Sequence, residues 1–222
     1  TVTGAGKLVA PTAKHLPKGT IRLSYAEKLL LPSRLTVDLG GGTFNPSVLS
    51  IAGGGCVTLA NGTLKPVRLM CAADSKAVVG AAATLGVTGT SGNTLEGEME
   101  VRTGGVFSDA GAISCSAGRL ALRGGTYRSV LAADTAKTFP WDRLAPNPAG
   151  TIDGTHTPEG AMWFEHKTVR TFDLGPGVTV LMRPLHMNGC SVIHLKSGTF
   201  SSTSSGISYK GSYPPTDSRY VN

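Results

Sequence analysis

Apolar and polar residues alternate in short stretches that recur along the chain, and each stretch ends in a glycine shortly before another apolar residue. Four stretches share one register: VDLGGGTF at 37–44, VTLANGTL at 57–64, LALRGGTY at 120–127 and IHLKSGTF at 193–200. MEVRTGGV at 99–106 fits the same pattern. Because side chains alternate across a strand, the first two apolar residues of each stretch share one face. The pattern predicts short β-strands that bury that face.

A glycine at the same place in every stretch marks the repeat. These marker glycines are Gly42, Gly62, Gly104, Gly125 and Gly198, at spacings of 20, 42, 21 and 73 residues. Glycine reaches φ > 0 at little steric cost, so we expect a corner of the chain at each of them. The spacing of 42 residues fits two turns of about 21, a period typical of solenoids, and the missing stretch is expected at VVGAAATL, 78–85.

These corners predict an all-β fold, a parallel β-helix with coils of about 20 residues. A β-sandwich is the alternative, but its strands follow one another at about 8 to 12 residues without such regular repetition. The composition agrees with many short strands, because the 222 residues include 30 glycines and 13 prolines and only 16% are charged. A chain of this length can bury one principal core.

The repeat divides the chain into five regions. We expect an N-terminal arm and cap at 1–34, β-helix coils at 35–132, a loop excursion at 133–177, further coils at 178–209 and a C-terminal tail or linker at 210–222. Within the arm, Ser24 and Glu27 have the spacing of a capping box and precede three leucines, which predicts a short helix that closes the end of the coil. A plain strand at TIRLSY, 20–25, is an equally supported alternative.

One stretch also carries a family resemblance. LLLPSRLTVDLGGGTF at 29–44 resembles the phrase that often begins the first coil in right-handed β-helix proteins of the pectin-lyase-like group, which includes bacteriophage tailspikes and tail fibres. Arg34 stands where that phrase usually has glycine. The resemblance implies the fold and carries little information about a reaction.

Charge and hydropathy narrow the expected partners. The formal charge is +7 and the pI is about 9.4, which permits attraction to acidic molecules. The 21 lysines and arginines are spread along the chain, so we expect no nucleic-acid partner. No apolar run reaches the roughly 18 residues that a membrane span needs, so no membrane-spanning segment is expected. The sequence begins without methionine or an apolar signal core, which indicates a processed chain or a fragment.

Charged residues on the outer face of the coils are the first candidates for a site. Arg102 and Arg123 each stand two residues before a marker glycine, which predicts a distance of roughly 5 Å between their strands. A solvated basic face is one interpretation, and a site for acidic glycan or phosphate is the other. Glu96, Glu98 and Glu100 share one face of a strand, but no apolar pocket nearby would raise a carboxyl pKa as a catalytic acid requires. We therefore expect a solvated acidic edge there.

The loop excursion carries both tryptophans and is the second candidate for glycan binding. Aromatic rings could stack on sugars, although the same rings could instead pin the loop to the coil or to another subunit. The candidate glycan-binding residues are Trp141, Trp163, Phe164, Asp142, Arg143, Asp153, His156 and Glu159, together with Arg102 and Arg123.

The cysteines and histidines predict no metal site, and no cofactor is expected. Cys56, Cys71, Cys115 and Cys190 form no CxxC pair, and the histidines have no HxH, HxxxH or HExxH spacing. Coil positions place Cys71 and Cys115 about 10 Å apart, which is beyond the reach of a disulfide. Four free thiols are therefore expected, and Cys56 with Cys71 is the one pair left open.

From these features and the resemblance we expect a structural or receptor-binding segment of an extracellular fibre, such as a phage tail fibre or tailspike, that attaches to host surface glycan. One alternative is a polysaccharide lyase or glycoside hydrolase, and another is a bacterial surface adhesin. The sequence favours a protein without enzymatic activity. The resemblance implies a homo-oligomer, usually a trimer, with cell-surface polysaccharide or lipopolysaccharide and other virion proteins as partners. It implies a location on the virion surface or the bacterial cell surface.

Overall fold

A computed structural model gives the fold of the chain. It describes residues 7–9, 29–31, 34–110, 117–128, 143–155, 162–164, 169–182, 185–188, 192–202 and 207–210. Side chains are described within 36–110, 117–128, 143–155, 173–182 and 194–202. This part of the chain is almost entirely strands and turns.

The strands form four sheets. Sheet A contains β1 (Lys7–Val9), β3 (Arg34–Phe44), β5 (Cys56–Leu64), β7 (Lys76–Gly86), β9 (Glu98–Arg102), β10 (Val106–Ser108), β11 (Arg119–Arg128), β12 (Ala149–Asp153), β15 (Gly177–Met182) and β18 (Thr199–Ser202). Sheet B contains β2 (Leu29–Leu31), β4 (Val48–Ile51), β6 (Arg68–Cys71) and β8 (Thr94–Leu95). Sheet C contains β13 (Met162–Phe164), β16 (Leu185–Asn188) and β19 (Ile207–Lys210), and sheet D contains β14 (Val169–Asp173) and β17 (Val192–Ser197).

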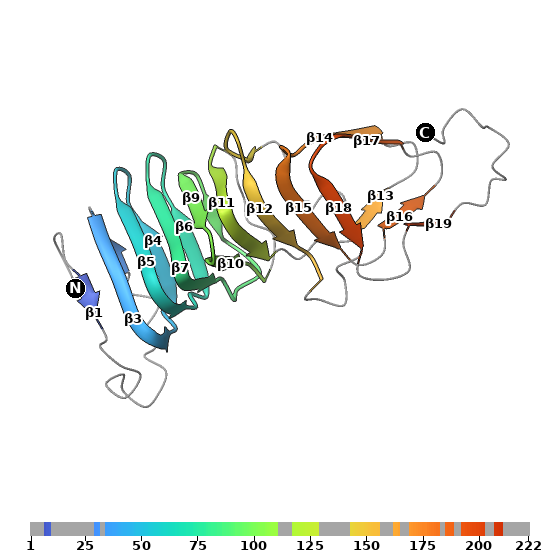
Figure 1. Cartoon of the computed structure of the whole chain (residues 1–222). Coiled ribbons are helices and arrows are strands. Elements are labelled where there is room, and N and C mark those ends of the chain that lie inside the picture. The colour runs from blue at the N-terminus through green and yellow to red at the C-terminus, as the bar shows by residue number, and fades with distance from the viewer. Residues whose placement is uncertain are drawn as a thin grey trace, which may run out of the picture.

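Every pairing between these strands is parallel, and each strand pairs with its equivalent in the neighbouring coil. β3 pairs with β5, β5 pairs with β7, and β11 pairs with β12, so the chain returns to the same sheet once per coil. The result is a parallel β-solenoid of about 6 turns. Figure 1 shows the coils stacked in sequence order along one axis, with β1 at one end and β18 towards the other. The predicted parallel β-helix is confirmed.

The missing member of the repeat lies in β7, as the sequence pattern predicts. Gly62 pairs with Ala83, and Leu64 pairs with Leu85. Alanine therefore takes the marker position in this coil, and its side chain is buried. The repeat is thus continuous from β3 to β11 although one of its glycines is replaced.

The structure corrects the marker position in the following coil. Val106 pairs with Thr126, so the preceding residue Gly105, and not Gly104, is in line with the marker glycine of the next coil. The inward apolar residue is consequently Phe107, which is 1% exposed. Because Gly104 and Gly105 are adjacent, the sequence pattern alone fits either of them as the marker glycine.

At Gly62 a glycine is needed because neighbouring coils approach closely at the corner. Gly62 has a φ angle of +85°, and a Cβ built on it would lie 2.7 Å from the carbonyl oxygen of Gly42 in the coil before. A side chain at this position would be strained both by its own backbone and by the neighbouring one. Gly198 also has a positive φ, of +94°, whereas in three other coils the positive φ lies one residue before the marker position, at Gly41, Gly104 and Gly124.

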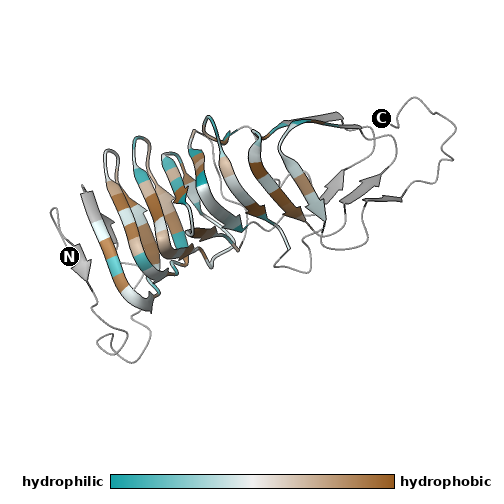
Figure 2. Cartoon of the chain, viewed as in Figure 1, coloured by the Kyte–Doolittle hydropathy of each residue, from teal (hydrophilic) through white to brown (hydrophobic). Residues whose placement is uncertain are grey.

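In sheet A, one face of the strands from β3 to β15 fills the interior of the solenoid. The colouring in Figure 2 alternates between hydrophobic and hydrophilic along these strands. Burial alternates in the same way, for example along β5 and β9. The predicted inward pairs that the structure bears out are Val37 with Leu39, Val57 with Leu59, and Leu120 with Leu122.

One predicted core position is wrong. Leu195 is 42% exposed, although the repeat assigned it to the core. It lies in β17, which pairs with β14 and has no second partner strand among the described residues. With one neighbouring strand, an inward position lacks the cover that a second neighbouring coil would give. The side chain of its predicted partner Ile193 lies outside the described residues.

Strands are found in two regions where the sequence predicted other structure. Leu29, Leu30 and Leu31 form strand β2, which pairs with β4, so these leucines are not part of the predicted capping helix. Residues 20–28, where the rest of the helix or the alternative strand was expected, lie outside the described residues. The predicted loop excursion at 133–177 contains β12, β13 and β14, so its second half belongs to the solenoid.

The two cysteines within the described residues are free thiols. Cys56 is partly exposed and Cys71 is buried, so the pair that the sequence left open does not form a disulfide. Burial raises the pKa of the Cys71 thiol to about 12. Cys71 therefore behaves as a small apolar core residue. Cys115 and Cys190 lie outside the described residues.

Candidate functional site

The candidate site is the outer face of sheet A where β7, β9 and β11 lie side by side. Parallel register brings Lys76 beside Glu98, and Glu98 beside Arg119. Four residues further along the same strands, Arg102 lies beside Arg123. Inward neighbours such as Leu122 are buried, so alternation directs these charged residues outward. We call Lys76, Glu98, Glu100, Arg102, Arg119 and Arg123 the charged face.

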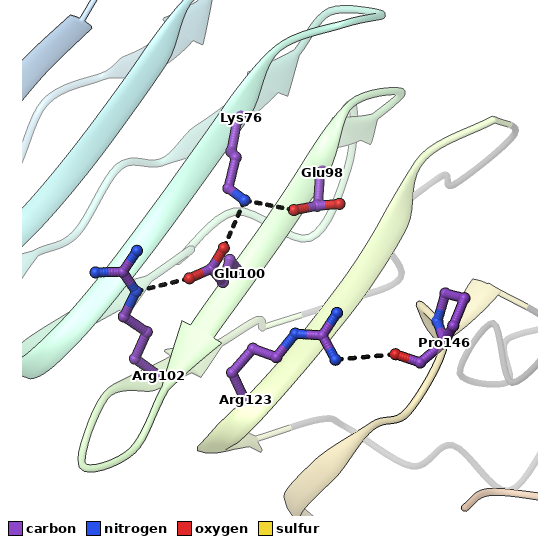
Figure 3. A network of polar contacts seen from close by, with 6 residues as sticks. All are labelled: Lys76, Glu98, Glu100, Arg102, Arg123 and Pro146. Atoms are coloured by element: carbon purple, nitrogen blue, oxygen red, sulfur yellow. Dashed lines mark hydrogen bonds and ion pairs between the residues drawn. The ribbon is translucent and has the colours of Figure 1, made fainter.

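An ion-pair network joins two strands of this face. Nζ of Lys76 lies 2.7 Å from Oε1 of Glu98 and 2.5 Å from Oε2 of Glu100. The other carboxylate oxygen of Glu100 accepts a hydrogen bond from Nε of Arg102 at 2.6 Å. Figure 3 shows the Glu100 carboxylate between the two cations. Both oxygens of Glu100 are therefore committed to partners from its own and the preceding coil.

The network shifts the pKa of two of its members. Partial burial alone would raise the pKa of Glu100, but hydrogen bonds from Lys76 and Arg102 outweigh it and hold that pKa below its usual value. Hydrogen bonds to Glu100 and Glu98 raise the pKa of Lys76. Both groups therefore stay ionised across the neutral pH range.

Two small apolar residues on the same outer face explain why Glu100 is partly buried. Val78 and Ala121 lie beside Glu100 in the register of β7 and β11. They are 3% and 1% exposed, and the Glu100 side chain between them is 14% exposed. The charges of this carboxylate and of its partners are thus held over an apolar base, where ion pairs are less screened than in water.

Arg119 and Arg123, two of the arginines of β11, differ in their contacts. Arg123 donates hydrogen bonds from Nη1 to the carbonyl oxygens of Pro146 and Asn147, each at 2.9 Å. Figure 3 shows this side chain reaching towards Pro146. Arg119 is exposed, and its guanidinium has no hydrogen bond or ion pair with the described residues. The charged face therefore holds one anchored and one free guanidinium on the same strand.

The structure brings only some of the predicted site residues together. Arg102 and Arg123 are neighbours, as predicted. Arg143 precedes Leu144, which bridges Leu120, so it lies close to the start of β11. Asp153 lies at the end of β12, where it accepts hydrogen bonds from Thr155 and lies 3.5 Å from Nε of Arg128.

The aromatic candidates do not share the strands of the charged face. Trp163 and Phe164 are in β13 of sheet C, beside His186 and Met187, whereas the charged face belongs to sheet A. Their side chains are outside the described set. Trp141, Asp142, His156 and Glu159 also lie outside the described residues.

Lys76 and Arg119 belong to the charged face but were not predicted from the sequence. Both precede the marker position of their coils by six or seven residues, as Glu98 does, so the repeat itself contained the signal. The marker of the β7 coil is Ala83, which hid the alignment of Lys76.

No group of three or more metal-ligating His, Cys, Asp or Glu residues is found within the described ranges. None of the helical segments in the described part of the chain is long and apolar enough to cross a membrane.

Comparison with protein-family models, with curated protein sequences and with solved structures gave no match.

Proposed function

We propose that this chain is a structural or receptor-binding segment of an extracellular fibre, of the kind found in phage tail fibres and tailspikes, that attaches to host surface glycan. The proposal rests on the resemblance of residues 29–44 and on the solenoid, which extends as a regular rod with charged side chains on a flat outer face. The charged side chains of three neighbouring strands offer several groups to a polymer that crosses them.

One observation favours attachment over cleavage. A glycosidase needs two carboxyl groups, one of which is kept protonated by a raised pKa. Glu98 and Glu100 instead form ion pairs with Lys76 and Arg102, and the pKa of Glu100 is lowered. These two glutamates are suited to positioning cations and not to proton transfer.

We extend the proposal to a trimeric fibre on the virion surface, joined to other virion proteins. In the resembling family the flat faces of solenoids associate around a three-fold axis, which is the basis for this step. Among the described side chains only Val67 and Leu195 are large, apolar and exposed, so contacts between these faces would be mainly polar. Light scattering at micromolar protein should give three times the chain mass, and a monomer would contradict the trimer.

The test of the proposed function is a panel of capsular polysaccharides and lipopolysaccharides. Incubation with the chain should give binding to at least one member without any shortening of the polymer, measured by sedimentation and by size-exclusion chromatography. Shortening would instead support a polysaccharide lyase or glycoside hydrolase on the same fold. Binding to no member would overturn the proposal. A bacterial surface adhesin is separated from a phage fibre by detecting the chain on bacterial cells instead of on virions.

A further inference from the structure

We propose that the guanidinium groups of Arg119, Arg123 and Arg102 form a binding surface for an acidic polysaccharide. The inference rests on the proposed attachment to glycan and adds the chemical class of that glycan, a linear polymer with carboxylate or sulfate groups. The three arginines lie on two neighbouring strands of sheet A and face outward from the solenoid.

The arrangement spans a surface instead of a single point. Arg102 and Arg123 are register neighbours, and adjacent strands lie about 4.8 Å apart. Arg119 lies four residues before Arg123 on β11, which corresponds to about 13 Å along an extended strand. A polymer crossing this face could therefore meet cations at two separate points, which suits repeated anionic groups better than one isolated anion.

The charge of the face favours an anionic ligand. Lys76, Arg102, Arg119 and Arg123 supply four positive charges against the two carboxylates of Glu98 and Glu100. Those carboxylates are neutralised by Lys76 and Arg102, whereas Arg119 has no ion-pair partner among the described residues. The positive excess is thus concentrated on β11, and Arg forms bidentate bonds with carboxylate and sulfate groups.

The contacts of the other arginines hold their guanidinium groups in place. Glu100 bonds Arg102 through Nε, and the carbonyls of Pro146 and Asn147 bond Arg123 through Nη1. The remaining N–H groups of each guanidinium can still donate to a ligand. Side chains that are positioned before binding lose less conformational entropy when the ligand arrives. Glu100 is therefore a positioning residue for the surface.

A polysaccharide fits this face better than a nucleic acid. The described outer face of β7, β9 and β11 carries no aromatic side chain on which bases could stack. It is also an open sheet face interrupted by two glutamates, whereas nucleic-acid surfaces concentrate uninterrupted positive charge. The experiment must therefore distinguish nucleic-acid binding from polysaccharide binding.

The experiment compares two polymers that differ only in charge. Dextran sulfate and neutral dextran are titrated against the intact chain by isothermal calorimetry at about 50 mM and about 200 mM salt. Two variants each lose one positive charge: Arg119→Gln on the charged face, and Lys65→Gln just after β5. Both side chains are exposed and unpartnered within the described ranges, so neither change is expected to prevent folding.

We expect dextran sulfate to bind and dextran not to bind, with weaker binding at the higher salt concentration. Arg119→Gln should weaken binding of dextran sulfate about tenfold, as expected for the loss of one charge-assisted contact. Lys65→Gln should change it less than about twofold because it lies outside the charged face. Arg119→Lys should retain more binding than Arg119→Gln.

Three results would overturn the inference. Equal binding of both polymers would exclude charge recognition and yet leave glycan attachment intact. Equal losses in Arg119→Gln and Lys65→Gln would show a response to net charge without a defined surface. Tighter binding of a DNA duplex than of dextran sulfate at equal salt would assign the surface to nucleic acid. The panel of cell-surface glycans tests the proposed function separately, so the two failures can be distinguished.

Discussion

A buried polar pair lies at the end of β10 and β11 and stands out among apolar neighbours. The hydroxyl of Tyr127 donates to the carboxylate of Asp109, and both residues are buried. The Tyr127 ring stacks on Phe107 with 5.2 Å between ring centroids. In the preceding coils the position of Asp109 is held by Val87 and Pro66, so the sequence repeat alone would predict an apolar residue there.

Tyr127→Phe should destabilise the protein by about 1 to 3 kcal/mol, because it removes a donor from a buried carboxylate and keeps the ring in place. Denaturant unfolding followed by circular dichroism measures the change. A loss below about 0.5 kcal/mol would mean that the hydroxyl is not needed.

The ion pairs of Glu100 predict a pH dependence of stability. Its pKa lies below the ordinary value of 4.5 in the folded state, so it stabilises the fold above that pH, and this contribution is lost as the pH falls through the folded pKa. The pKa of Lys76 lies above its ordinary value of 10.5. Lys76 therefore stabilises the fold below pH 10.5, and this contribution is lost as the pH rises through the folded pKa.

Glu100→Gln should therefore lower the melting temperature at neutral pH, by a stability change of about 1 kcal/mol. The loss should shrink as the pH falls through the lowered pKa of Glu100, because wild-type Glu100 then becomes protonated as well. Glu96→Gln is the matched control, since Glu96 is exposed and has no ion pair with described residues. An equal pH dependence of both variants would contradict the role of the network.

At the scale of the element, the strands and corners could be predicted from the sequence because both follow local rules. Alternating residues and marker glycines placed β5 and β11 correctly, and the degenerate member of the repeat lies in β7, within the predicted stretch 78–85. Errors arose where local rules allow two answers. Gly104 and Gly105 give equivalent alignments, and three leucines at 29–31 suit a helix and a strand alike until pairing with β4 decides.

The corner glycines allow a direct test of coil spacing. A Cβ on Gly125 would lie 2.5 Å from the carbonyl oxygen of Arg102, whereas on Gly86 it would first meet the Ser108 hydroxyl at 3.2 Å. Gly125→Ala should cost about 2 kcal/mol, because a backbone atom of the neighbouring coil must move. Gly86→Ala should change stability by less than about 1 kcal/mol, because a side chain can rotate away. Thermal unfolding of both variants checks the difference, and equal losses would contradict close packing at the corner.

At the scale of the whole molecule, the candidate site could be predicted only in part. Its arginines Arg102 and Arg123 follow from the repeat, since equivalent positions stack in a solenoid. The free guanidinium of Arg119 and the bonds of Arg123 to Pro146 and Asn147 depend on how separate coils meet, which no local pattern records. The exposure of Leu195 likewise depends on which strands lie beside β17, which its local sequence does not record.

The stacked architecture predicts that the same substitution has different effects at the middle and at the end of the solenoid. Leu122 is 0% exposed and lies in β11, which has partner strands on both sides. Leu195 occupies the equivalent place in its sequence stretch but is 42% exposed. Leu122→Ala should lower the free energy of unfolding by about 2 to 5 kcal/mol, because it leaves a cavity between coils. Leu195→Ala should lower it by less than about 1 kcal/mol, because little buried surface is lost. Denaturant unfolding of the two variants measures both effects. Similar losses would mean that another part of the assembly covers the last coil and that the solenoid continues beyond it.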